Sequence, residues 1–313
     1  MTPATPIDHD DVPQLLANPT ATRVARIAGL ARRQARSKHG RFLVEGPQGV
    51  REAVRWAPER VLDLYMTEAA ASRHPEIWAE AKAAGLYRHL TTAEVMAAMS
   101  ADAQGVLAVA AMGESNGADA LTGALEGTRL VAVLTGAQDP GNAGTIIRAA
   151  DAAGADAVIL LRGSVEATSP KVVRSTAGSL FHLPVITGVG LEEAVKALRA
   201  AGLTILVADS RGETDLFEAE ASAACGGLLS APSAWLLGNE AHGFAPEVLN
   251  RADAVISIPI LGRAESLNVA TAAALCLYAS ARAQRAYPPP PALDSARSPI
   301  APVRSVDCGR PRE

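Results

Sequence analysis

The sequence predicts an α/β protein with two domains, from its length, its composition and the order of its apolar runs. The chain has 313 residues, enough for about two domains of roughly 150 residues each. Its composition is 49% hydrophobic and 20% charged, which is typical of a globular protein with sizeable cores. Short apolar runs alternate with longer amphipathic ones, so strands and helices are expected to alternate along the chain.

The first domain is expected at 19–112, after a flexible N-terminus at 1–18 and before a linker at 113–128. Pro47 suits the first turn of a helix and Gly85 suits the end of another. The alternation favours a small α/β sandwich. The expected elements are helix 19–36, strand 41–46, helix 47–57, strand 61–66, helix 74–85, extended segment 86–90, helix 91–99 and strand 105–112.

The second domain is expected at 129–286, where apolar strands are separated by helical stretches. Such strands predict a mainly parallel sheet that is covered on both faces. Ligands of these sheets bind beyond the carboxyl ends of the strands, so the loops there are expected to carry the chemistry. A proline-rich tail at 287–313 is expected to be disordered. The strand candidates are 130–136, 156–161, 183–187, 203–209, 234–238 and 254–260.

The charge distribution argues for a local rather than a general attraction to nucleic acid. A net charge of −4 does not suit a uniformly basic nucleic-acid binder. One stretch of the first domain nevertheless carries seven cations and no Asp or Glu, so it is a candidate RNA-binding patch. The alternative is a solvated helix face. The seven residues are Arg23, Arg26, Arg32, Arg33, Arg36, Lys38 and Arg41.

The cysteines and the N-terminus indicate a cytoplasmic protein without a metal site. Cys225, Cys276 and Cys308 form no CxxC pair and no metal-ligand spacing, which suggests reduced thiols. No apolar run reaches the roughly 18 residues that a bilayer span needs. The first residues are acidic and lack an apolar core, so they do not look like a secretory signal.

The first of three unusual loops follows the strand at 130–136. The chain runs from Gly136 through a Gly- and Pro-containing loop into a helix expected to begin near Ala143. Asn142 stands at the expected cap of that helix, where its side-chain oxygen can accept from a free N–H. Arg148 follows among apolar neighbours, where an arginine is unusual unless it snorkels or meets an anion.

The other two loops also place polar residues after predicted strands. Gly238 ends one strand, and Glu240 in the next turn either receives a positive charge or simply belongs to a polar turn. Ser266 and Asn268 precede an alanine-rich helix, so they either cap it or hold a ligand. Leu267 between them can pack under a flat ligand.

Together these loops resemble a known family. The segments "TGAQDPGNAGTIIRAADAAGADAVIL", "LLGNEAHGF" and "ISIPILGRAESLNVATAAALCLY" resemble the three signature motifs of the SpoU (TrmH-like) RNA 2′-O-ribose methyltransferases, of the SPOUT superfamily. They occur in the family's order and at similar spacing, over 129–286. The segment "ARIAGLARRQARSKHGRFLVEGPQGVREAV" resembles the small RNA-binding domain that often precedes this catalytic domain.

The resemblance implies a SPOUT-type parallel sheet with a C-terminal trefoil knot, preceded by a small α/β RNA-binding domain. It implies transfer of a methyl group from S-adenosyl-L-methionine to a ribose 2′-hydroxyl, in a homodimer. Ribosomal RNA is favoured over transfer RNA because the first domain resembles those of ribosomal RNA enzymes. The implied catalytic residues are Arg148, which acts on the hydroxyl, with Asn142, Glu240, Ser266 and Asn268, and the implied cofactor-binding residues are Thr135, Gly136, Gly238, Ile258 and Leu267.

Two other functions compete with this one. A nicotinamide-dependent oxidoreductase would need a glycine fingerprint, but Gly188 and Gly190 lack a third glycine at the required place. Asp209 is the only acidic residue that could end the following strand in that role. A non-catalytic RNA-binding protein on the same fold would require loss of the motif residues, and these are present.

Overall fold

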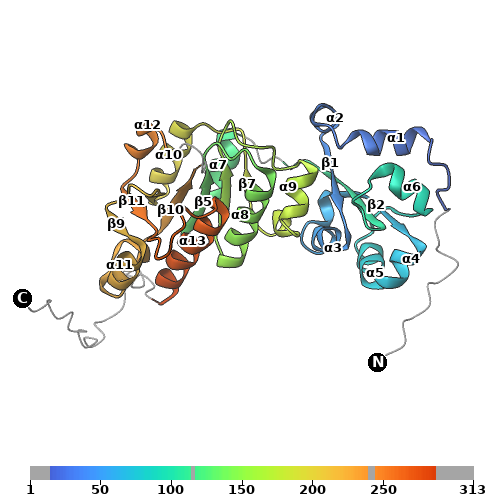
Figure 1. The fold of residues 1–313 in the computed structure, drawn as a ribbon. Helices are drawn as coiled ribbons and strands as arrows, with labels where there is room; N and C mark the ends of the chain where they lie inside the picture. The colour runs from blue at the N-terminus through green and yellow to red at the C-terminus, as the bar shows by residue number, and fades with distance from the viewer. Residues whose placement is uncertain (1–14, 114–116, 239–243, 287–313) are drawn as a thin grey trace, which may run out of the picture.

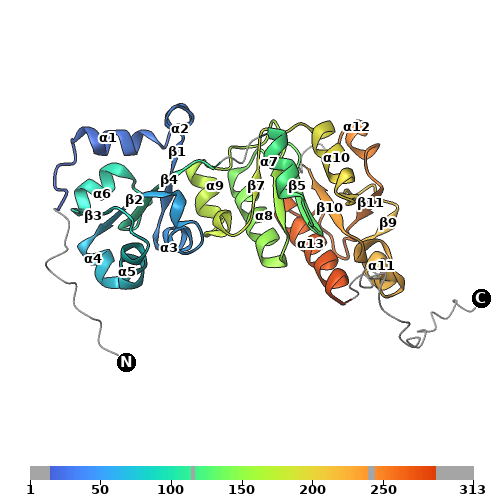
Figure 2. The ribbon, with the colours of Figure 1, turned by 180° about the vertical axis from the view of Figure 1, so that it is seen from behind.

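The structure is a computed structural model that describes residues 15–113, 117–238 and 244–286. It contains two α/β domains side by side, with the first in blue and teal and the second in green to red (Figure 1). The view from behind shows the same arrangement (Figure 2). Most of the predicted flexible N-terminus and all of the proline-rich tail lie outside the described residues.

The first domain is built on a mixed four-stranded sheet in the order β1-β4-β2-β3. β4 pairs antiparallel with both β1 and β2, whereas β2 and β3 are parallel. The predicted α/β sandwich is therefore present. Its elements are α1 (Thr22–Gly29), α2 (Arg33–His39), β1 (Arg41–Glu45), α3 (Pro47–Trp56), η2 (Pro58–Arg60), β2 (Val61–Thr67), α4 (Glu68–Arg73), α5 (Pro75–Ala83), β3 (Arg88–Thr91), α6 (Ala93–Met99) and β4 (Val106–Ala111).

The single helix predicted at 19–36 is wrong, because the chain breaks between α1 and α2. Val24, Ile27 and Leu30 are all buried in one apolar cluster with Tyr65. A turn after Leu30 then redirects the chain, with the Arg32 N–H bonded to the Gly29 carbonyl. This turn lets α2 point toward the second domain. Helix α4 was not predicted; the Thr67 hydroxyl caps it by accepting from the Ala70 N–H at 3.2 Å.

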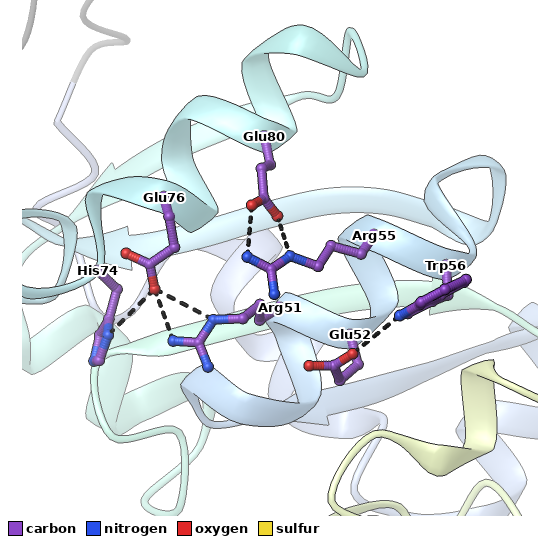
Figure 3. Close-up of polar contacts among 7 residues, drawn as sticks. All are labelled: Arg51, Glu52, Arg55, Trp56, His74, Glu76 and Glu80. Carbon is purple, nitrogen blue, oxygen red and sulfur yellow. Dashed lines mark hydrogen bonds and ion pairs between the residues drawn. The ribbon is translucent and has the colours of Figure 1, made fainter. Parts of the chain in front are cut away.

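Paired charges join α3 to α5 on the surface of the first domain (Figure 3). Arg51 and Arg55 lie one turn apart on α3 and pair with Glu76 and Glu80 on α5, each at 2.7 Å. Surface pairs of this kind add little stability, since water and salt screen them. The apolar contacts beneath them, between α3 and α5, carry the packing.

The second domain has a seven-stranded sheet in the order β7-β6-β5-β10-β8-β11-β9, and every neighbouring pair is parallel. The predicted parallel sheet is confirmed. Its strands are β5 (Leu130–Leu134), β6 (Ala157–Leu160), β7 (Val185–Ile186), β8 (Thr204–Ala208), β9 (Thr214–Asp215), β10 (Ser233–Leu237) and β11 (Ala254–Ser257).

Helices cover both faces of this sheet. Along β5, Ala132 and Leu134 belong to the core under α8 and α13, while Val131 and Val133 belong to the core under α7 and α10. The helices are α7 (Gly117–Ala124), α8 (Pro140–Ala153), α9 (Pro170–Ser175), η3 (Ser179–Phe181), α10 (Leu191–Ala200), α11 (Leu216–Ala221), η4 (Ser222–Cys225), η5 (Leu228–Ser230), α12 (Pro246–Leu249) and α13 (Val269–Ala286).

The linker expected at 113–128 is not a simple connection, because it contains α7. Leu121 and Leu125 on this segment are buried against the second sheet. The glycines in this stretch suggested a loop, but burial of two leucines favours a helix here. The segment belongs to the core of the second domain.

The two domains share a packed interface around α9, which lies between the two sheets (Figure 1). Phe42 on β1 stacks on Phe181, with ring centroids 6.4 Å apart. Arg36, only 3% exposed, makes a two-pronged ion pair with Glu166, with N–O distances of 2.9 and 2.6 Å. Arg174 on α9 pairs with Glu45 on β1. Both apolar and ionic contacts therefore fix the domains against each other.

The Arg36–Glu166 pair should stabilise this interface. Burial alone would raise the pKa of Glu166, but hydrogen bonds from Arg36 and Thr168 and the nearby guanidinium charges lower it. Glu166→Gln leaves a buried guanidinium without its counter-charge, so it should cost about 2 kcal/mol, measured by urea unfolding. Glu80→Gln, which breaks the exposed pair with Arg55, is the control and should change the midpoint little.

Acid should remove the same stabilisation. Because the folded-state pKa of Glu166 is lowered, the pair contributes above the unfolded carboxyl pKa of roughly 4.3 and is lost as pH falls below it. The difference in free energy of unfolding between wild type and Glu166→Gln should therefore become smaller in acid. Equal midpoints for wild type and variant at neutral pH would show that the pair is not stabilising.

Candidate cofactor and RNA site

The carboxyl ends of β5, β10 and β11 meet at one edge of the second sheet, as parallel strands require. Both the N–H and the hydroxyl of Thr135, just after β5, donate to the Leu237 carbonyl at the end of β10, at 2.9 and 3.3 Å. Gly136 has a φ of +66°, a left-handed conformation that glycine adopts without strain. The loop after β5 therefore turns sharply beside β10.

Helix α8 begins three residues earlier than the sequence indicated. Its cap is Asp139, whose carboxylate accepts from the Asn142 N–H at 2.8 Å. The assignment of Asn142 as the cap is wrong, because Pro140 suits the first helical position and the aspartate before it accepts from the free amide. Asn142 instead lies in the first turn, with its side-chain oxygen turned toward α13.

Asn268 joins the two helix starts. Its side-chain oxygen accepts from the N–H groups of Ala270 and Thr271, at 2.9 and 3.3 Å, and so caps α13. Its amide donates to the side-chain oxygen of Asn142 at 3.0 Å, although the two residues are 126 positions apart. Asn268 therefore serves both as a cap and as a tie between α8 and α13. Ser266 precedes the cap by two residues.

A cavity of about 190 Å³ lies beside this tie, at the ends of β8, β10 and β11. It includes four of the predicted residues, Gly238, Ile258, Ser266 and Leu267. Thr135 and Gly136 lie at the neighbouring strand end and are not part of its wall. The lining residues are Ala208, Asp209, Ser210, Leu237, Gly238, Phe244, Ile258, Ile260, Glu265, Ser266, Leu267, Val269 and Ala272.

The sequence did not lead us to predict an ion pair beside this wall, between Asp209 and Arg211. Asp209, at the end of β8, accepts two hydrogen bonds from the Arg211 guanidinium, at 2.8 and 2.9 Å. These bonds, the largest cause, lower the pKa of Asp209 to about 2. Arg211 also donates to the Phe244 carbonyl at 2.9 Å. An aspartate directly after a buried strand, with an arginine two residues later, was the available signal, but the contact with Phe244 comes from another loop.

Gly238 is required by the close approach of Phe244. A Cβ atom on Gly238 would lie 2.7 Å from the Phe244 ring, which is too close for any side chain. The cavity lining thus combines Gly238, with the Phe244 ring packed on it, and the apolar side chains of Ile258 and Leu267. Such a lining suits a flat, largely apolar group with polar edges, as the adenosine part of S-adenosylmethionine has. Glu240 lies outside the described residues.

Arg148 stands on the exposed side of α8. Within the described part of the chain, no hydrogen bond or ion pair holds its guanidinium. One turn further along α8, the Ala152 carbonyl accepts from the Tyr278 hydroxyl of α13 at 3.2 Å. Arg148 is therefore available to an anion, and it borders the surface where α8 and α13 lie side by side.

The basic stretch of the first domain is divided between surface and interior. Arg36 does not belong to an exposed RNA patch, because it is buried in the ion pair with Glu166. Arg23 bonds to Asp63 and to the Tyr65 hydroxyl, both at 2.8 Å. Arg23 stays exposed despite these bonds, and the other exposed members are Arg26, Arg32, Arg33, Lys38 and Arg41.

The described residues bear on membrane insertion and on metal binding. Among their helices, none combines the length and the apolar character that a membrane span requires. Nor do they contain a group of three or more His, Cys, Asp or Glu side chains that could hold a metal ion.

Two family models match the chain, and they correspond to its two sheets. Residues 129–278 match the SpoU rRNA Methylase family. Residues 21–108 match the MRM3-like substrate binding domain. The first match contains α8, the cavity and most of α13, and the second contains the mixed sheet.

Curated relatives match over most of the chain. It is 30% identical over 244 residues to the 23S rRNA (guanosine-2′-O-)-methyltransferase RlmB of Bordetella pertussis, covering 77% of this chain and 96% of the relative. It is 32% identical over 248 residues to the 23S rRNA (guanosine(2553)-2′-O)-methyltransferase RlmP of Bacillus subtilis, covering 79% and 90%.

Solved structures of similar proteins include two with bound S-adenosylmethionine. The SpoU methyltransferase AviRb of Streptomyces viridochromogenes, in complex with this cofactor, has a TM-score of 0.71 and 28% identity, covering 85% of this chain and all of its own. The cofactor-bound rRNA methyltransferase of Sinorhizobium meliloti has a TM-score of 0.70 and 28% identity, covering 86% and 97%. These matches over both domains show that the chain belongs to the SpoU rRNA methylase family.

Proposed function

We propose that this protein transfers a methyl group from S-adenosylmethionine to the 2′-hydroxyl of a ribose in ribosomal RNA. The observation that supports this most directly is the Asn142–Asn268 hydrogen bond. It joins the starts of two helices beside a cavity at the carboxyl edge of a parallel sheet, the edge at which such sheets bind ligands. Relatives named as 23S rRNA methyltransferases match over nearly their whole length and support the choice of RNA.

The cavity at the strand ends is the proposed cofactor site, where bound S-adenosylmethionine supplies an electrophilic methyl group on its sulfonium. Ile258 and Leu267 contribute apolar walls for the adenine, and Gly238 with the Phe244 ring packed on it belongs to the same lining. Thr135 and Gly136 hold the neighbouring strand end in place. The proposal includes the family's trefoil knot, formed by the segment that leads into α13.

Arg148 is the proposed catalytic residue. A guanidinium stays protonated in proteins, so its role is to hold an RNA phosphate and orient the ribose hydroxyl toward the methyl group. Alignment of oxygen, methyl and sulfur carries much of such a displacement. Asn142 and Asn268 fix the helix on which Arg148 stands. Ser266 and Glu240 complete the proposed site.

Ribosomal RNA is preferred over transfer RNA because the first domain matches an MRM3-like substrate binding domain and the cited relatives carry ribosomal names. The exposed cations of α1 and α2 would contact phosphates there. A non-catalytic RNA-binding protein is the remaining alternative, disfavoured by the intact tie between α8 and α13. The cytoplasmic location and the domain limits given above stay predictions.

A homodimer through α13 is part of the proposal. Phe217 on α11 and Leu275 and Tyr278 on α13 are 49%, 42% and 52% exposed, and they line one groove. Large apolar side chains gathered in this way often mark an interface. Tyr278 contacts α8 one turn from Arg148, so a second copy on this face would stand next to the catalytic arginine.

Replacing the proposed catalytic group tests the mechanism directly. Arg148→Ala should lower methyl transfer to ribosomal RNA at least about a hundredfold, because the reacting groups lose their alignment. Binding of S-adenosylmethionine, measured by calorimetry, should stay unchanged. Arg199→Ala, an exposed arginine on α10, is the control and should keep full activity. Normal turnover in Arg148→Ala would refute the assignment.

Two variants of Asn268 separate its two roles. Asn268→Asp keeps the oxygen that caps α13 but cannot donate to Asn142, whereas Asn268→Ala removes both bonds. Each variant should lose methyl transfer by roughly tenfold or more, but only Asn268→Ala should also lose about 1 kcal/mol of stability. Activity assays and thermal unfolding measure the two effects. Wild-type activity in Asn268→Asp would mean that the tie to Asn142 is dispensable.

The dimer can be tested by light scattering. The active protein should have twice the mass of the chain, and Leu275→Glu should yield a monomer, because a charge on an apolar interface loses its solvation. Tyr87→Glu places the same charge on an exposed site of the first domain and should remain dimeric. A monomeric mass for active wild-type protein would contradict the proposal.

A further inference from the structure

A second and larger cavity lies between the two domains, with a volume of about 530 Å³. This interdomain cleft is lined from the first domain by Arg33 and Ser37 of α2 and by Arg60 after α3. The second domain contributes Leu160 at the end of β6, the following loop at 161–168, and the residues around β7. A volume of this size is in the range of ligand sites, which is about 300–1,000 Å³.

Arg60 is the least exposed cation in this lining, and no described residue accepts a hydrogen bond from its guanidinium. Its guanidinium carbon lies 5.8 Å from the centre of the Phe42 ring and 5.6 Å from that of Phe181. Its Nε atom is buried without a hydrogen-bond partner among the described residues. Burial, the largest cause, lowers the pKa of Arg60, because the charged form loses solvation. A buried donor of this kind is costly unless something binds it.

The aromatic contacts do not by themselves account for Arg60. Phe42 and Phe181 can engage the face of the guanidinium through its positive charge. The five N–H groups lie in the plane of the same group and point away from that face. They can form a fork toward an anion with two oxygens, as phosphates and carboxylates have. An anion in the cleft would therefore meet N–H groups that no described residue binds.

The rim of the cleft is also basic. Arg33 is 84% exposed and Arg162, after β6, is 67% exposed. The carboxylates near them are already engaged: Glu166 with Arg36 and, at 3.7 Å, with Arg33, and Glu193 with Arg162 at 3.1 Å. Arg60 has no carboxylate partner within the described residues, so positive charge exceeds negative charge along the cleft.

The wall of the cleft is hydrogen-bonded to the loop between β5 and α8. The Val165 N–H donates to the Ala137 carbonyl at 2.7 Å, and the Gln138 amide donates to the Gly163 carbonyl at 2.5 Å. Ala137 and Gln138 lie between β5 and α8, which carries Arg148. A strand of RNA held in the cleft would therefore run past the edge of the sheet where methyl transfer is proposed.

We propose that this interdomain cleft binds the phosphodiester backbone of the RNA substrate, with Arg60 as its inner anchor and Arg33 and Arg162 on its rim. The inference rests on the proposed function and adds a second RNA contact that both domains form together. An elongated polyanion fits better than a single phosphate, because the three arginines come from separate segments and a chain of phosphates can reach all three.

The test compares Arg60→Gln and Arg162→Gln with the wild type. The probe is a short fluorescein-labelled oligouridylate, whose binding is followed by anisotropy at several salt concentrations. Arg199→Gln is the matched control, since Arg199 is also an exposed arginine with one carboxylate partner, Asp253. Thermal unfolding and S-adenosylmethionine affinity are recorded for each variant. If Arg60→Gln folds poorly, Arg60→Lys, which keeps the charge, and Arg162→Gln still decide the question.

Each cleft variant should bind the oligouridylate roughly tenfold more weakly, and the slope of log affinity against log salt should fall by about 0.7 to 1 per arginine removed. Arg60→Lys should lie between Arg60→Gln and the wild type. Cofactor affinity should stay the same. Unchanged RNA affinity in both Arg60→Gln and Arg162→Gln would overturn the inference.

Two further measurements distinguish an RNA site from a small-anion site and the cleft proposal from the proposed function. If inorganic phosphate protects wild type but not Arg60→Gln against thermal unfolding, while RNA affinity is the same in both, the cleft is a small-anion site and the RNA proposal is wrong. Methyl transfer by the wild type is measured in parallel on ribosomal RNA. If the wild type methylates ribosomal RNA and the cleft variants bind RNA as well as it does, only the cleft proposal is refuted. If the wild type neither transfers a methyl group nor binds the cofactor, the proposed function itself is refuted.

Discussion

Parallel pairing of all seven strands in the second domain is the constraint on which the rest of the structure depends. It brings the carboxyl ends of β5, β10 and β11 to one edge, although these strands lie far apart in the sequence. Only because of this convergence can Asn268 donate to Asn142 across 126 positions. The resulting bond fixes the starts of α8 and α13, and those two helices carry the proposed catalytic and dimer surfaces.

The interface between the domains has a second role beyond holding them together. Arg36 and Glu166 form a buried ion pair there, and Phe42 stacks on Phe181 nearby. Because these contacts restrict how the domains move, the cleft beside them keeps a defined shape. The first domain contributes one wall of the proposed RNA-binding cleft, and the opposite wall is hydrogen-bonded to the loop between β5 and α8.

Predictions failed where local signals competed with packing. The stretch at 19–36 has a helical period throughout, but Leu30 is buried in the core of the first domain and the chain turns after it. The stretch at 113–128 is rich in glycine, yet Leu121 and Leu125 bury against the sheet and order α7. Asn142 has the residue type of a cap, but Asp139 precedes a proline and takes that position. In each case a contact remote in sequence or a better local partner decided.

The sequence by itself determined the fold class, most element positions, the three motif loops and the family, because these follow from apolar periodicity and from short runs of residues. Tertiary structure decided what those residues contact. Only the folded chain shows that Asn268 both caps α13 and binds Asn142, that Arg36 is buried while its neighbours are exposed, and that Arg60 faces a cleft. The physical reason is that burial and pairing are set by elements distant in sequence, which no local pattern specifies.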